Sequence, residues 1–214
     1  MARVLNMMQF LDMNGAAIIE ATLQHLYLSF GSVLIGCLVA IPAGIWITGR
    51  DKLAGHVLRV IGTIQTIPSL ALLGFALPLF GIGTLPAMIV LFLYSLLPIL
   101  RNTYTGLISI NPAFIEAGKG MGMSGRQLLF MVKLPLALPV IMDGIKISTV
   151  YILSWATLGA LIGAGGLGDL IFTGIQTADA NYILAGAVPV ALLTAAAGWL
   201  LGRAEIALTP AGGK

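Results

Sequence analysis

Runs of apolar residues long enough to cross a lipid bilayer are the feature that most limits how this chain can fold. The first run, residues 25–47 (HLYLSFGSVLIGCLVAIPAGIWI), contains no Lys, Arg, Asp or Glu. A helix needs about 20 predominantly apolar residues to cross the hydrocarbon core of a membrane. Four similar runs follow, at about 59–80, 85–106, 146–164 and 182–202. With 58% hydrophobic and only 9% charged residues among 214, the chain is too apolar for an ordinary soluble domain. We predict an all-α polytopic membrane protein of about five transmembrane helices, forming a single domain over residues 1–214.

The distribution of basic residues between the runs predicts the orientation. The connection 81–84 (GIGT) has no charge, and the connection at about 165–181 carries only two acidic residues. The other connections are basic, which marks the cytoplasmic side, and an odd number of spans puts the two ends of the chain on opposite sides. We therefore expect the amino terminus outside, the carboxyl terminus in the cytoplasm, and the segment 111–135 in the cytoplasm. The basic residues that decide this are Arg50, Lys52, Arg59, Arg101, Lys119, Arg126, Lys133, Lys146, Arg203 and Lys214.

Small residues and prolines in the runs give packing expectations. A stripe of small residues at every fourth position of the first run lets another helix come close, either within the chain or from a partner; it consists of Ser32, Gly36, Ala40 and Gly44. Prolines are expected to break or end helices repeatedly, as is common where helices bend or line a cavity. They are Pro42, Pro68, Pro78, Pro86, Pro98 and Pro189.

No sequence motif in the chain fits a nucleotide-binding, metal-binding or catalytic site in its context. The sequence GAGGLG at 163–168 matches a dinucleotide-binding pattern, but no strand is predicted before it, so a nucleotide role is not expected. His25 and His56 have no cysteine or carboxylate at metal-ligand spacing, and we expect both to be interfacial. Cys37 has no basic neighbour that would activate its thiol, and it is expected to be a packing residue. We predict no enzyme activity, no metal site, no cofactor and no nucleic-acid partner.

Ionisable residues are scarce inside the spans, which argues against transport driven by an ion gradient. Carriers of that class usually place ionisable groups at membrane depth to bind the coupling ion. Asp143 and Lys146 lie at the cytoplasmic entrance of the fourth span, one helical turn apart, and are expected to pair. If the chain transports a solute, we expect its energy to come from another subunit.

The segment 111–135 (NPAFIEAGKGMGMSGRQLLFMVKLP) is the charged interruption in this apolar chain. Asn111 and Pro112 are a helix cap and first turn, and Gly120 and Gly122 should stop that short helix. An S-x-x-Q capping box at Ser124 should start a second helix, which Pro135 and Pro139 should end or bend. The two short helices form either an element that docks on a partner or an amphipathic hairpin that only connects two spans.

A resemblance bears on these alternatives. Residues 116–118 (EAG), Gly122 and the end of the segment, VKLP at 132–135, resemble the EAA loop of ABC importer permeases, E-A-A-x(3)-G-x(9)-I-x-L-P, with Gly118 for the second alanine and Val132 for isoleucine. Elsewhere TIQTIPSLALLG (63–74), LFLYSLLPILRNTYTG (91–106) and IGAGGLGDLI (162–171) resemble permeases that import glycine betaine, carnitine or choline.

The resemblance implies a type I ABC importer permease in the cell membrane of a prokaryote. The loop would dock into a cytoplasmic ATPase subunit, present in two copies, that uses ATP and Mg²⁺; this chain has no G-x(4)-G-K-[ST] phosphate loop of its own. A second permease chain, identical or paralogous, and an extracytoplasmic substrate-binding protein would complete the assembly. The residues expected to couple the permease to the ATPase are Glu116, Ala117, Gly118, Lys119 and Gly122.

Polar residues in spans two to four are candidates for the substrate pathway: Gln65, Thr66, Ser69, Asn102, Ser154 and Trp155. A quaternary ammonium group cannot donate a hydrogen bond and is held best by aromatic faces, so we expect tight recognition in the binding protein and only weak contacts in the pathway. Two alternatives stay open for the function, namely an ABC permease for another small solute such as an amino acid, and a membrane scaffold without transport activity.

Overall fold

The chain folds into an all-helical bundle in a computed structural model, which describes the backbone of residues 2–208 and the side chains of residues 9, 10 and 12–208. Lys214, one of the basic residues used to orient the chain, lies outside the described residues. Four long helices form the body: α1 (Ala2–Ile47), α4 (Thr84–Ile108), α7 (Leu134–Trp155) and α9 (Ala180–Leu208). The shorter elements are α2 (Asp51–Thr66), α3 (Ser69–Phe80), α5 (Pro112–Gly120), α6 (Gly125–Gln127), the π-helix η1 (Leu128–Lys133), the 3₁₀-helix η2 (Ala156–Ile162) and α8 (Leu167–Thr177).

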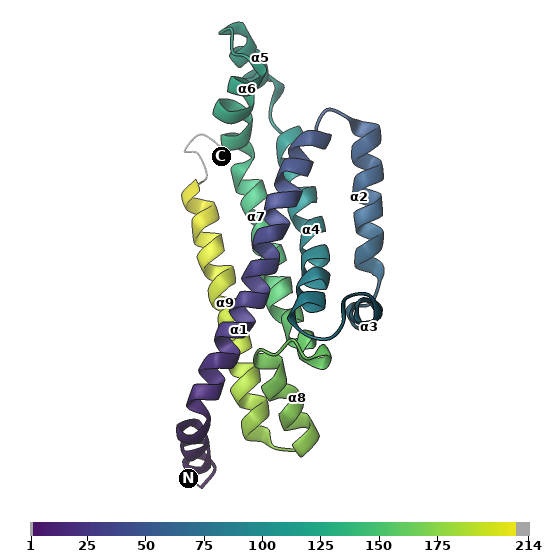
Figure 1. Cartoon of the computed structure of the whole chain (residues 1–214). Coiled ribbons are helices and arrows are strands. Elements are labelled where there is room, and N and C mark those ends of the chain that lie inside the picture. The colour runs from purple at the N-terminus through teal and green to yellow at the C-terminus, as the bar shows by residue number, and fades with distance from the viewer. Residues whose placement is uncertain (1, 209–214) are drawn as a thin grey trace.

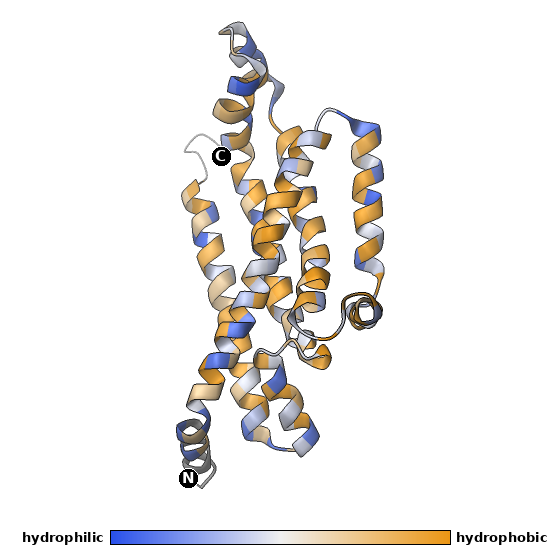
Figure 2. Ribbon diagram, in the orientation of Figure 1, coloured by the Kyte–Doolittle hydropathy of each residue, from blue (hydrophilic) through white to orange (hydrophobic). Residues whose placement is uncertain are grey.

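The long helices run along one axis, with α1 crossing in front of α4 and α7 (Figure 1). Helix α2 packs on the outer side of α4, and α9 packs on α7 and α8. The segment 111–135, called here the 111–135 hairpin, projects from one end of the bundle, while α8 and the start of α1 lie at the opposite end (Figure 1). Hydrophobic residues cover most of the long helices, whereas hydrophilic residues gather at both ends (Figure 2). This distribution is that of a membrane-spanning bundle.

Four of the five predicted spans are confirmed as helices long and apolar enough to cross a membrane. They lie within Asp12–Ile47, Thr84–Ile108, Gly125–Ile162 and Ala180–Leu208. Each is longer than predicted. The predicted fourth span, 146–164, is part of one continuous helical rod, which runs from the 111–135 hairpin through η1 and α7 into η2.

The predicted second span, 59–80, is wrong as a continuous helix. Helices α2 and α3 are bent by 94° at the two residues between them. Ile67 has an extended backbone (φ −70°, ψ 129°), because the ring of Pro68 disfavours a helical conformation in the preceding residue. The pair counts as a fifth span only as a broken helix.

The expectation that prolines break helices repeatedly is also wrong. Only Pro68 lies at a break, and the others are accommodated within helices or at the start of one. Pro135 and Pro139 do not interrupt the rod either. The π-helix η1 ends just before Pro135, and its wider turns, with Leu134 N–H bonded to Leu129 O, lead into α7 without a break.

The small-residue stripe of α1 packs within the chain. A Cβ on Gly36 would lie 2.1 Å from the Ser95 Oγ, and one on Gly44 would lie 2.7 Å from Thr103. Both contacts are to α4. The packing alternative is therefore confirmed for this stripe, since the close approach that small residues allow is already used inside the bundle.

His25 is fully buried inside the bundle. Its Nε2 lies 2.9 Å from Leu153 O at the end of α7. Next to it, Gln24 Oε1 accepts a 3.0 Å hydrogen bond from Gly166 N. Gly165 and Gly166 have φ of +77° and +83°, and Gln24 fills the space of a Gly165 side chain. The GAGGLG loop is thus a packing element that holds α8 against α1.

Candidate functional site

The 111–135 hairpin has the local geometry that its sequence predicts. The Asn111 side chain caps α5 by accepting a 3.0 Å hydrogen bond from Ala113 N. Gly122 ends α5 with a φ of +78°, in a Schellman arrangement where Gly122 N and Met123 N donate to the carbonyls of Lys119 and Gly118. Ser124 then forms the reciprocal capping box that starts α6.

The five predicted coupling residues do not all face the same way. Glu116, Ala117 and Lys119 are exposed on α5, whereas Gly118 is buried. A Cβ at Gly118 would lie 2.7 Å from Leu128 Cδ1 and 3.3 Å from Met123 Sδ. Gly118 therefore lets α5 pack against the second arm of the hairpin, and the predicted coupling residues available to a partner are Glu116, Ala117, Lys119 and Gly122.

The hairpin is joined mechanically to the bundle. Its second arm continues through η1 into α7 without a break. Further along α7, Lys146 Nζ forms ion pairs with Asp143 at 2.8 Å, as predicted, and with Glu205 of α9 at 2.6 Å. A displacement of the hairpin would thus act on α7 and, through Lys146, on α9.

Three of the pathway candidates gather at the break between α2 and α3. Gln65 Nε2 donates a 2.7 Å hydrogen bond to Tyr94 O of α4, and the Tyr94 hydroxyl donates to Ile67 O. The Trp155 ring meets the Tyr94 ring edge to face at 4.7 Å. Thr66 ends α2 beside the break, with its hydroxyl bonded to Thr63 O.

The remaining candidates lie apart from this group or make no described contact with it. Ser69 begins α3 just past the break and is half-buried. Asn102 lies against Gly144 at the α4–α7 contact, and its amide donates to Pro98 O at 2.9 Å. The six residues therefore do not form one continuous surface in this chain.

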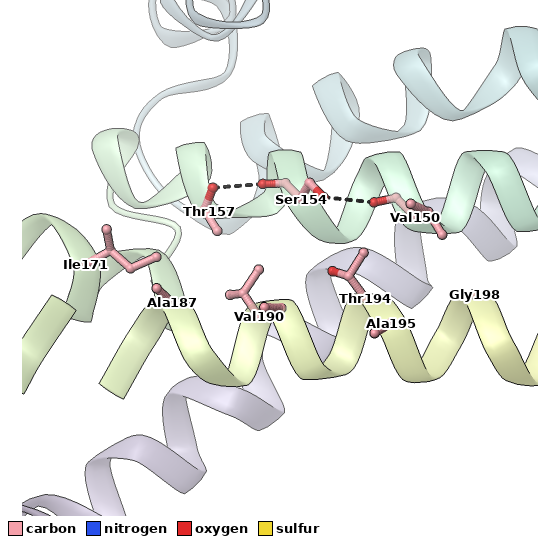
Figure 3. A pocket seen from close by; sticks show the side chains of 10 residues that line it. Val150, Ser154, Thr157, Ile171, Ala187, Val190, Thr194, Ala195 and Gly198 are labelled. Carbon is pink, nitrogen blue, oxygen red and sulfur yellow. Dashed lines mark hydrogen bonds between the residues drawn. The ribbon is translucent and has the colours of Figure 1, made fainter. Parts of the chain in front are cut away.

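Ser154 lines a groove of about 560 Å³ between α7, α8 and α9 (Figure 3). The groove is mostly apolar, with hydroxyls from Ser154, Thr157 and Thr194. The Ser154 hydroxyl donates to Val150 O, and the Thr157 hydroxyl donates to Ser154 O (Figure 3). Thr194 Oγ1 is buried without a hydrogen-bond partner among residues 2–208. No group of three or more His, Cys, Asp or Glu side chains that could hold a metal ion occurs in the described part of the chain.

Comparison with known proteins assigns the chain to a family. Residues 28–205 match the model of the binding-protein-dependent transport system inner membrane component. The chain belongs to this family. It is similar to the choline transport system permease protein OpuBB of Bacillus subtilis, with 48% identity over 97% of this chain and 95% of that protein. It is also similar to the glycine betaine/carnitine/choline transport system permease protein OpuCB of the same organism, with 47% identity over 96% and 95% of the two chains.

The fold of the permease agrees with a solved structure from an ABC transporter. A chain of the MetNI methionine transporter, determined in inward-facing conformations, superposes with a TM-score of 0.80 at 24% identity, over 90% of this chain and 96% of that one. This likeness confirms the predicted fold of a type I importer permease in a multi-span membrane protein.

Sequence reasoning missed three features of the permease. Tyr94 joins the α2–α3 break to Trp155, but in the sequence it is one aromatic residue in an apolar run and carries no local signal. Glu205 was not paired with Lys146 because the two are 59 positions apart. Tyr151, which stacks on Trp155, could have been found by its spacing of four residues, which places both rings on one helical face.

Proposed function

We propose that this permease imports small solutes with a quaternary ammonium group, such as glycine betaine, carnitine or choline. The observation that carries the proposal is 47–48% identity over nearly the whole chain to two permeases named for these substrates. An amino acid is the alternative substrate class, and a scaffold without transport activity is the alternative outside transport. The likeness to the methionine transporter concerns the fold and does not favour an amino acid.

The 111–135 hairpin is the proposed docking element for a cytoplasmic ATPase subunit, present in two copies, which binds ATP and Mg²⁺. Its projection from the bundle and its exposed Glu116, Ala117 and Lys119 support this role (Figure 1). Gly118 and Gly122 give the hairpin its shape, since the first permits close packing and the second permits the left-handed turn. ATP hydrolysis in the partner would move α7 through the hairpin.

The rest of the assembly follows from this role. A second permease chain, identical or paralogous, completes the pathway, and an extracytoplasmic substrate-binding protein delivers the solute. The end with the 111–135 hairpin faces the cytoplasm, so the start of α1 lies outside, and residues 1–214 act as one transmembrane domain. Gln65, Thr66, Ser69, Asn102, Ser154 and Trp155 stay candidates for the pathway.

Uptake of labelled solutes tests the substrate class. Cells that lack other osmoprotectant systems would be supplied with the permease together with its ATPase and binding protein. We expect ATP-dependent accumulation of labelled glycine betaine, choline or carnitine, and no accumulation of labelled methionine or histidine. Uptake of an amino acid alone would replace the substrate class, and uptake of neither class in a correctly inserted complex would favour the scaffold.

A further inference from the structure

Three aromatic rings from two helices form a cluster beside the α2–α3 break. Trp155 of α7 meets Tyr94 of α4 edge to face at 4.7 Å, and it stacks on Tyr151 with ring centroids 5.7 Å apart and planes 26° apart. Tyr94 is buried and fixed by its hydrogen bond to Ile67 O. Trp155 is half-buried, while Tyr151 is 49% exposed. The cluster therefore has a fixed base and one open ring.

The cluster lies well inside the bundle. Tyr94 is ten residues along α4 from Thr84, or about 15 Å from that end. Trp155 is nine residues along α7 from the ion-paired Lys146, or about 14 Å from that level. Aromatic residues that anchor a membrane protein lie at its two interfaces. An interfacial belt does not account for Tyr94 and Trp155, which lie midway between these levels, whereas Tyr151 is five residues, or about 8 Å, along α7 from Lys146.

The open ring carries a polar group that lipid cannot satisfy. Among residues 2–208, the Tyr151 hydroxyl has no hydrogen-bond partner. A hydroxyl that faces hydrocarbon without a partner costs free energy, so a tyrosine with a free hydroxyl at this depth favours a water-filled surface. The neighbouring Ser154 is exposed on the same helix. This part of α7 is suited to a polar pathway.

We propose that Tyr151 and Trp155, supported by Tyr94, form a transit site for the quaternary ammonium group of the solute inside the permease. This inference rests on the proposed function and gives that function a location in the chain. A cation without N–H groups is attracted to the faces of aromatic rings, which also tolerate its methyl groups. An exposed two-ring site holds such a cation weakly, and weak binding allows the solute to leave the pathway. Tight capture is left to the binding protein.

Trp155 can itself report on binding. The chain has three tryptophans, and Trp46 and Trp199 are 59% and 63% exposed, so both can be replaced by phenylalanine to leave Trp155 as the only one. The full-length chain with these two substitutions would be titrated in lipid nanodiscs with tetramethylammonium chloride. We expect a saturable change in Trp155 fluorescence in the millimolar range. Potassium chloride at equal ionic strength and neutral tert-butanol should give no saturable change.

Substitutions at Tyr151 distinguish the contribution of its aromatic ring to cation binding from that of its hydroxyl. Tyr151→Phe keeps the aromatic face and should bind tetramethylammonium within about threefold of the parent, whereas Tyr151→Leu should bind it about two- to tenfold more weakly. In the complete transporter, Tyr151→Leu should lower the rate of solute uptake while ATPase stimulation by the loaded binding protein is retained. Equal titration curves for Tyr151→Leu and the parent, or an equal response to potassium, would overturn the site.

The two proposals fail in different ways. The titration uses only this chain and a model cation, so it decides on the aromatic site even if no osmoprotectant is imported. Normal uptake of glycine betaine with no saturable response of Trp155 would reject the site and leave the proposed substrate class intact. A saturable response in a chain that imports only amino acids would reject the substrate class.

Discussion

Two glycines of the 111–135 hairpin serve different physical purposes. Gly122 is needed for its backbone, since its φ of +78° is unfavourable for a residue with a Cβ, although no atom lies within 4 Å of where that Cβ would be. At Gly118 the constraint is one of space, since a Cβ there would lie 2.7 Å from Leu128 Cδ1, the end of a side chain that would have to shift. The EAA-like motif predicts the glycine at position 122 but has alanine where Gly118 stands, and the fold shows which constraint acts at each position.

Substitution of Gly122 should therefore follow backbone preference. Asn tolerates the left-handed conformation, so Gly122→Asn should be the mildest change, Gly122→Ala should cost about 1 to 2 kcal/mol, and Gly122→Val should cost more. Hydrogen exchange of the hairpin amides in the purified chain measures the local opening. Gly120→Ala is the control, because Gly120 is helical and has open space around it, so exchange should not increase. Equal effects of Gly120→Ala and Gly122→Ala would contradict the assigned role of Gly122.

Glu116 should govern association with the ATPase subunit. A charge-assisted contact is worth about 1.5 to 3 kcal/mol, so Glu116→Lys should weaken binding of the ATPase about tenfold or more and abolish uptake at normal levels of membrane insertion. Co-purification of the ATPase and uptake measure the two effects. Asp51→Lys is the matched control, because Asp51 is an exposed acid of α2 outside the hairpin. Intact association and uptake in Glu116→Lys would leave the hairpin as a simple connection between spans.

At the scale of the elements, the α2–α3 pair has one feature that depends on neighbouring residues and one that depends on distant contacts. Pro68 is visible in the sequence and explains why the helix breaks after Thr66. The 94° bend and its stabilisation depend on Tyr94, which lies 27 positions from Ile67. Hydropathy and local turn residues predict the long spans and the caps of the hairpin because these depend on neighbouring residues. The angle of the bend between α2 and α3, the burial of His25 and the Lys146–Glu205 pair depend on distant contacts and could not be predicted in this way.

Tyr94→Phe should loosen the break between α2 and α3. The substitution keeps the ring against Trp155 but removes the hydroxyl that donates to Ile67 O. Loss of a partner for a carbonyl shielded from water costs about 1 to 3 kcal/mol, so the thermal midpoint should fall and amide exchange at the start of α3 should rise. Tyr104→Phe is the control, because the half-buried Tyr104 hydroxyl has no hydrogen-bond partner among residues 2–208. If both variants melt at the parent temperature, the hydroxyl does not stabilise the break.

At the scale of the whole molecule, one continuous rod links the two ends of the bundle. It begins in the 111–135 hairpin, includes η1 and α7, and ends in η2 at the packed loop that His25 and Gln24 hold against α1. Midway, Lys146 joins the rod to α9. An ATPase subunit that moves the hairpin would therefore act on α9 and on the opposite end of the bundle through rigid elements. This arrangement requires the hairpin to face the cytoplasm.

Accessibility of single cysteines tests that orientation. Three exposed positions are suitable in a Cys37→Ala parent: Ile82 (81% exposed) and Thr177 at the end opposite the hairpin, and Met121 (70% exposed) in the hairpin. With an impermeant thiol reagent and intact cells, Ile82→Cys and Thr177→Cys should react, whereas Met121→Cys should react only after the membrane is opened. The parent without cysteine gives the background. Labelling of Met121→Cys in intact cells would place the hairpin outside, where no ATPase subunit could reach it. That result would contradict the proposed coupling role.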